Sequence, residues 1–123
     1  MTLNQNLRYF LVYAWVVITL VLIGTPMDEY DGDVFTYYDK FAHAFIFGFF
    51  AFLVFNAKYQ GNKKTIKKYF WQSLYLSLAF AALGEIIQTV VPGRTESFLD
   101  FVAGALGALL LLILSAFAYA RKK

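Results

Sequence analysis

Four apolar stretches follow one another along this chain and leave little room for anything else. They run from Tyr9 to Gly24, Phe41 to Ala57, Tyr69 to Val91 and Phe101 to Ala120. An α-helix needs about 20 residues to cross a hydrocarbon core of about 30 Å, and each stretch is close to that length. The sequence therefore predicts an all-α membrane protein, a bundle of four transmembrane helices over residues 8–24, 39–57, 66–91 and 98–120.

The composition agrees with a chain that lies in lipid. Apolar residues make up 60% of the 123 residues, and the mean hydropathy is +0.57. Soluble domains are about 45–50% apolar, and a soluble fold this small could not hide so much apolar surface. We expect one domain spanning residues 1–123 in the lipid bilayer, and no nucleic-acid partner. The chain has no cysteine, which excludes disulfides and thiolate chemistry.

Basic and acidic residues are segregated along the chain. Nine of the eleven Lys and Arg residues lie at the start, in the middle connection and at the end: Arg8, Lys58, Lys63, Lys64, Lys67, Lys68, Arg121, Lys122 and Lys123. The eight acids lie in or beside the other two connections: Asp28, Glu29, Asp31, Asp33, Asp39, Glu85, Glu96 and Asp100. Because short loops rich in Lys and Arg favour the cytoplasm, we expect both termini inside and the short acidic connections outside.

Local signals predict where the helices begin and end. Thr36-Tyr37-Tyr38-Asp39 and Ser97-Phe98-Leu99-Asp100 resemble capping boxes, with Asp in the place of Glu, and would each start a helix at the outer surface. Pro92-Gly93 would stop the third helix there. At the first helix, Ile23-Gly24-Thr25-Pro26 lacks the small-x-small pattern of a signal cleavage site, so we expect that helix to be retained.

Small residues indicate which helices pack most closely. In lipid, helices associate where small side chains let their backbones approach. The second span has Ala44-x-x-x-Gly48, and the fourth has Ala103-x-x-x-Gly107 and Gly104-x-x-x-Ala108. We therefore expect spans two, three and four to form the tight bundle, with span one more peripheral.

Ionisable and polar residues gather near the outer helix ends. Asp39 and His43 are four residues apart and so share one face of the second helix, while Glu85 and Gln88 are three apart on one face of the third. Intramembrane ionisable groups are costly and usually point into the bundle, paired or functional. These candidate site residues are Asp39, Lys40, His43, Glu85, Gln88, Arg94, Ser97 and Asp100.

The order and spacing of these residues resemble a known family. The pattern comprises Asp39-Lys40-x-x-His43, Glu85-x-x-Gln88, Pro92-x-Arg94-x-x-Ser97-x-x-Asp100 and Gly104-x-x-Gly107. It is similar to the VanZ-like family of small membrane proteins and covers the chain from Asp39 to about Leu110. The resemblance implies a role in the bacterial cell envelope and a link to resistance against glycopeptide antibiotics of the teicoplanin type. It implies no reaction.

Each candidate also has a purely structural explanation. Asp39 and Asp100 could serve only as helix caps, Arg94 could bridge Glu85 and Asp100, and His43 could be a hydrogen-bonded packing residue. Glu85, however, is expected to lie deeper than any cap, which favours a functional site. We expect no metal and no cofactor. A cation at the cluster would be Mg²⁺ or Mn²⁺ rather than zinc, but no local two-ligand motif supports it.

Two functions fit this cluster, and a third fits less well. In the first, the protein recognises a lipid-linked cell-wall component, an anionic headgroup or an amphiphilic antibiotic at the outer leaflet, with Arg94, Gln88, Lys40 and Ser97 as binding residues. In the second, it is a membrane-embedded hydrolase or transferase. His43 is then the general base or the nucleophile, Asp39 orients its ring, Arg94 stabilises developing negative charge, and Glu85 or Asp100 is the acid. A proton-coupled transporter ranks last, because few polar residues lie near the midplane. The oligomeric state stays open.

Overall fold

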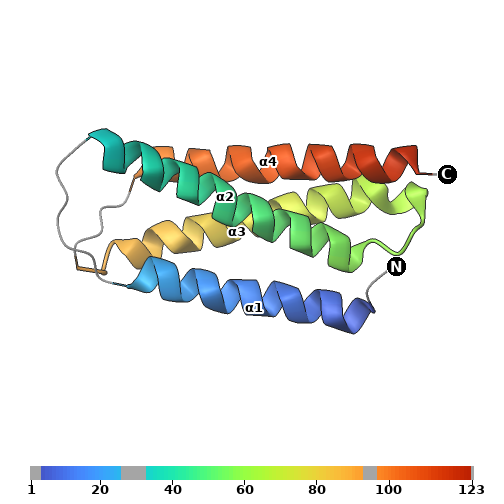
Figure 1. Ribbon diagram of the computed structural model, residues 1–123, viewed down its shortest axis with the longest axis horizontal. Helices are drawn as coiled ribbons and strands as arrows, with labels where there is room; N and C mark the ends of the chain where they lie inside the picture. Colours follow the sequence, from blue (N-terminus) through green and yellow to red (C-terminus); the bar gives the residue numbers. More distant parts are fainter. Residues whose placement is uncertain (1–3, 26–32, 93–96, 123) are drawn as a thin grey trace.

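The computed structural model describes residues 4–25, 33–92 and 97–122, with the side chains of the second range described from residue 38 onward. Four long helices form a bundle: α1 (Gln5–Gly24), α2 (Asp33–Lys58), α3 (Ile66–Gln88) and α4 (Phe98–Arg121). A short 3₁₀ turn, η1 (Lys63–Thr65), precedes α3. All four helices are long and apolar enough to cross a membrane, so the four-helix prediction is confirmed. The start of α1 and the end of α4 lie at the same end of the bundle (Figure 1).

Two helix boundaries differ from the expected ones. The second helix begins at Asp33 rather than at residue 39, so the proposed capping box at Thr36 to Asp39 is wrong. Nothing between Asp33 and Asp39 breaks a helix, and an acid in the first turn favours an earlier start through the helix dipole. The third helix ends at Gln88, three residues before the predicted end, since a residue that precedes proline, here Val91, avoids the helical conformation.

The α2 and α4 helices make the most extensive contact, and α1 packs mainly on α2, which confirms that α1 is the more peripheral helix. The backbones of α2 and α4 meet at the predicted small residues. A Cβ atom on Gly48 would lie 2.8 Å from the carbonyl oxygen of Gly107, and one on Gly107 would overlap the carbonyl oxygen of Ala44. No side chain fits between the two helices at this crossing.

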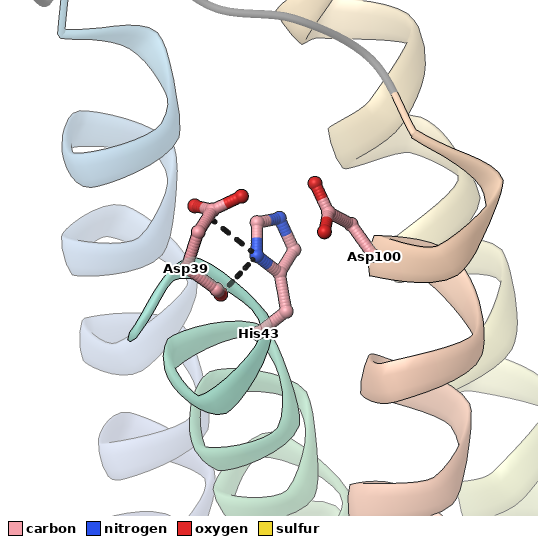
Figure 2. A group of neighbouring side chains, drawn as sticks. All are labelled: Asp39, His43 and Asp100. Atoms are coloured by element: carbon pink, nitrogen blue, oxygen red, sulfur yellow. Dashed lines mark hydrogen bonds and ion pairs between the residues drawn. The ribbon is translucent and has the colours of Figure 1, made fainter. Parts of the chain in front are cut away.

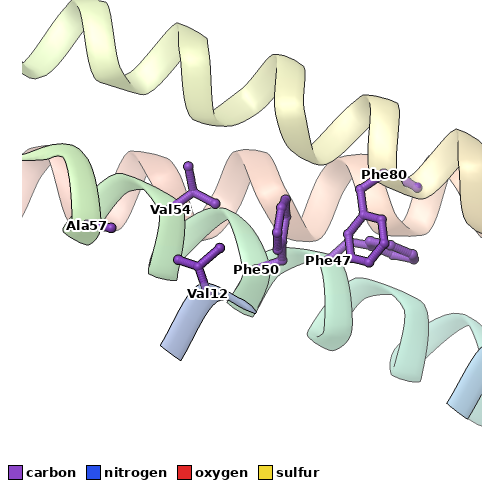
Figure 3. Packing of buried hydrophobic residues seen from close by; sticks show 7 residues of the cluster. Val12, Phe47, Phe50, Val54, Ala57 and Phe80 are labelled. Carbon is purple, nitrogen blue, oxygen red and sulfur yellow. The ribbon is translucent and has the colours of Figure 1, made fainter. Parts of the chain in front are cut away.

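Aromatic side chains fill the space between the other helix pairs. Phe47 and Phe50 on α2 pack against Phe80 on α3, with ring centroids 5.5 and 4.8 Å from the Phe80 ring, and Val12 of α1 closes this cluster (Figure 3). A Cβ atom on Gly104 would lie 2.9 Å from Phe47. The glycines of α4 therefore serve both helix contact and aromatic packing.

The end of α2 near the chain termini is held by Arg8 of α1. The Arg8 guanidinium donates hydrogen bonds to the carbonyl oxygens of Asn56, at 2.6 Å, and Tyr59, at 2.8 Å. The last carbonyls of a helix have no partner within it and carry partial negative charge, which a cation satisfies. Tyr59 is buried and lies against the Tyr119 ring at 4.4 Å between centroids.

Candidate functional site

The candidate site residues that the structure describes gather at the end of the bundle opposite the chain termini (Figure 1). Asp39, Lys40 and His43 lie near the start of α2. Glu85 and Gln88 lie in the last turn of α3, and Ser97 and Asp100 lie at the start of α4. Arg94 lies outside the described residues. Three helices thus contribute polar side chains to one region.

His43 is the centre of the cluster. The residue is only 5% exposed. Its Nδ1 lies 2.8 Å from the backbone carbonyl oxygen of Asp39 and 3.6 Å from the Asp39 carboxylate. A carbonyl oxygen only accepts, so Nδ1 is the nitrogen that carries the proton. Nε2 faces the Glu85 carboxylate at 3.4 Å. The expected shared face of Asp39 and His43 therefore holds, and Glu85 of α3 joins it.

Asp100 is buried at 2% exposure and pairs with Lys40, whose ammonium lies 3.2 Å from Oδ1. This pair links α4 to α2. The sequence suggested that Asp100 would close a capping box with Ser97, yet Ser97 is the residue before α4 and makes no side-chain capping bond. The helix start was predicted correctly, but the role of Asp100 was not, because Lys40 of a distant helix competes for its carboxylate.

Glu85 uses both carboxylate oxygens. Oε1 faces His43, and Oε2 accepts a hydrogen bond from the backbone N–H of Ser97 at 3.0 Å. Glu85 thereby satisfies the N–H group that the acid of a capping box would satisfy. The expectation that Glu85 lies deeper than any cap is wrong, because α3 ends at Gln88 and leaves Glu85 in its final turn.

An open groove of about 490 Å³ lies between α3 and α4, beside this cluster. Its lining residues are Ala82, Glu85, Ile86, Ser97, Phe98 and Phe101. Glu85 thus belongs to the groove and to the histidine cluster. Sequence reasoning missed the apolar lining, although Phe98 and Phe101 are three residues apart and so share a helix face.

The remaining candidates contribute in different ways. Gln88 is buried at 2% exposure, and Ser97 contributes its backbone N–H.

Asp39, His43 and Asp100 each place one nitrogen or oxygen atom within 4.8 Å of the other two. In Figure 2 the carboxylates of Asp39 and Asp100 flank the His43 ring on opposite sides. Chemically, this arrangement can hold a proton between His43 and Glu85 or gather several acceptors around one ligand group.

Comparison with known proteins assigns the chain to a family. Searches of the curated proteins and of the solved structures each returned no match. The family model described as VanZ/LLP1 matches residues 4–119, a range that covers α1, α2, α3, all but the last two residues of α4 and every candidate site residue. With its four apolar helices, the chain is a multi-pass membrane protein that belongs to the VanZ/LLP1 family.

Proposed function

We propose that this protein recognises an amphiphile at the outer leaflet of the bacterial plasma membrane. The ligand is a lipid-linked cell-wall component or an amphiphilic antibiotic of the teicoplanin type, and binding contributes to glycopeptide resistance. The observation that carries the proposal is the groove between α3 and α4, which joins an apolar wall to the polar cluster through Glu85. A ligand that enters it meets both kinds of surface.

The apolar part of the groove suits an acyl or prenyl chain. Phe98 and Phe101 supply aromatic area on α4, and Ala82 and Ile86 line the α3 side. Phe98 is 76% exposed, so its ring is accessible from the surrounding lipid. Ligand pockets commonly combine such apolar lining with a few polar groups that fix orientation.

The polar part of the site favours a ligand that donates hydrogen bonds. Lys40 is paired with Asp100, and His43 faces Glu85. The carboxylates of the described residues therefore offer acceptor positions to hydroxyl, amide or ammonium groups. Sugars, peptides and glycopeptides all carry such groups.

The orientation of the site follows from the charge distribution. The end of the bundle that holds the chain termini and η1 carries most of the lysines and arginines, and the candidate site lies at the other end. By the bias of basic loops toward the cytoplasm, the site faces the extracytoplasmic side.

A binding titration tests the proposal. Full-length protein in lipid nanodiscs is titrated with a lipoglycopeptide of the teicoplanin type and, separately, with a lipid-linked cell-wall precursor. Ala82→Phe fills the groove and is expected to weaken binding at least tenfold, whereas Ala118→Phe, an exposed position near the far end of α4, leaves it unchanged. Equal binding by both variants, or no binding of either ligand by the wild type, contradicts the proposal.

A second function is favoured by one specific contact. Glu85 touches the groove on one side and His43 on the other, so a proton taken from a bound ligand could pass to the imidazole. In a hydrolase or transferase on an envelope lipid, His43 is the general base, Asp39 orients it, Arg94 stabilises developing negative charge and Asp100 or Glu85 is the acid.

Turnover distinguishes the second function from the first. Purified protein is incubated with a panel of envelope lipids, and products are followed by mass spectrometry. Product formation that is abolished by His43→Ala supports the enzyme. Ligand binding without any product across the panel supports recognition alone.

A further inference from the structure

We propose that the cluster around His43 binds one divalent cation of the Mn²⁺ or Mg²⁺ class. The ligands are Nε2 of His43 and one carboxylate oxygen each from Asp39 and Asp100. One donor atom from each of these residues lies within 4.8 Å of the others. Two donors that share an ion at about 2.1 Å lie at most about 4.2 Å apart, so small side-chain rotations bring all three onto one ion.

His43 is already arranged as a metal ligand. Its Nδ1 is 2.8 Å from the Asp39 carbonyl oxygen, and this bond keeps the proton on Nδ1 and leaves the lone pair on Nε2. Metal-binding histidines almost always donate their second nitrogen to a carbonyl or a carboxylate, which fixes the ring and its tautomer. The ring therefore needs no reorientation to bind a cation.

Glu85 of α3 lies beside the proposed site. Its Oε1 is 3.4 Å from His43 Nε2, whereas the donors that lie within 4.8 Å of one another come from Asp39, His43 and Asp100. Its other oxygen stays on the Ser97 N–H. A cation held by these three residues would join α2 and α4, with Glu85 next to it.

The charge balance also favours a cation. Among the described residues, the carboxylates of Asp39 and Glu85 lie 3.6 and 3.4 Å from the His43 ring nitrogens, and Asp100 pairs with Lys40. Carboxylates that share one site repel one another, and a cation relieves that repulsion. Asp100 is 2% exposed, so a divalent ion offsets charge where water cannot.

Lys40 is the competitor of the proposed ion. Its ammonium lies 3.2 Å from Asp100 Oδ1, and its side chain is 28% exposed, so it can move toward the surface when a cation arrives. The sequence disfavoured a metal because no local two-ligand motif is present. The structure replaces that motif with donors from α2 and α4, and one imidazole with two carboxylates suits Mn²⁺ or Mg²⁺.

Electron paramagnetic resonance with Mn²⁺ alone, on full-length protein in detergent, tests the site. The wild type is expected to bind one Mn²⁺ saturably, with Mg²⁺ competing. His43→Ala and Asp100→Asn each weaken Mn²⁺ binding at least tenfold. Lys64→Gln changes the charge of an exposed residue in η1, at the opposite end of the bundle, and leaves the affinity within about twofold.

Lys40→Gln keeps every ligand and removes the competing ammonium, so it is expected to tighten Mn²⁺ binding several-fold. This variant keeps the test decisive if a ligand variant fails to fold. No saturable Mn²⁺ binding by the wild type, or unchanged affinity in Lys40→Gln, overturns the site. The assay contains no amphiphile, so its outcome is independent of the proposed recognition. Metal on Nε2 would also prevent His43 from acting as a general base.

Discussion

Glu85, in the last turn of α3, accepts a hydrogen bond of 3.0 Å from the backbone N–H of Ser97, the residue that precedes α4. The acid that caps α4 thus comes from the preceding helix rather than from α4 itself. Asp100, which could have closed the cap locally, is paired with Lys40 of α2. This exchange of partners connects three helices at the end of the bundle where the groove opens.

Replacement of Glu85 separates its two roles. Glu85→Ala leaves the Ser97 N–H without its acceptor and is expected to lower the free energy of unfolding by about 1–2 kcal/mol. Glu85→Gln keeps an oxygen for that N–H but removes the charge beside His43, so it costs less. Unfolding in mixed detergent micelles, followed by circular dichroism, measures both. Equal destabilisation by the two variants would show that the cap contributes little.

Gly107 is expected to be the most sensitive glycine. Gly107→Ala places a Cβ atom against the backbone of Ala44, which cannot move aside, so we expect a loss of about 2–3 kcal/mol or misfolding. In Gly104→Ala the Cβ atom meets the Phe47 ring, which can shift, and the loss is smaller. Gly24→Ala meets nothing within 4 Å and is the control. Melting temperatures that rank Gly104→Ala below Gly107→Ala would contradict this packing.

Arg8 is expected to stabilise the bundle through the end of α2. Arg8→Met removes the charged donor from the carbonyls of Asn56 and Tyr59, and hydrogen bonds to charged groups contribute about 1.5–3 kcal/mol. Lys64→Met removes the same charge from an exposed side chain and serves as the control. The difference between the two variants in the free energy of unfolding in detergent measures how much Arg8 stabilises the end of α2. Equal values would show that Arg8 contributes only to the orientation of the chain in the membrane.

Much of this fold could be predicted from the sequence, because length, hydropathy and small residues are local signals. The four spans were predicted, and so was a close packing of the second and fourth spans through small residues that include Ala44, Gly48 and Gly107. The shared face of Asp39 and His43 follows from helical spacing alone. These features need no knowledge of how distant segments meet.

The features that sequence could not predict depend on choices between partners. Lys40 of a distant helix pairs with Asp100, and Glu85 rather than Asp100 caps α4. Arg8 looked like a topological charge but binds the end of α2. In each case several residues have suitable chemistry, and only the way the helices cross decides which of them lies close enough to pair.

The proposed orientation can be tested because the chain has no cysteine. Pro92→Cys lies at the site end of the bundle, and Gln60→Cys lies in the exposed connection before η1. In intact cells, a membrane-impermeant maleimide is expected to label Pro92→Cys, while Gln60→Cys reacts only after lysis. The reverse pattern would place the candidate site in the cytoplasm.

The groove between α3 and α4 is proposed to hold the apolar part of an amphiphile. A teicoplanin-type ligand with a photoreactive acyl chain is bound to the protein in nanodiscs and crosslinked, and the modified peptides are identified by mass spectrometry. Crosslinks are expected to concentrate on Ala82, Ile86, Phe98 and Phe101 and to disappear in Ala82→Phe. Crosslinks spread over α1, or concentrated around Phe117 at the opposite end of α4, would contradict it.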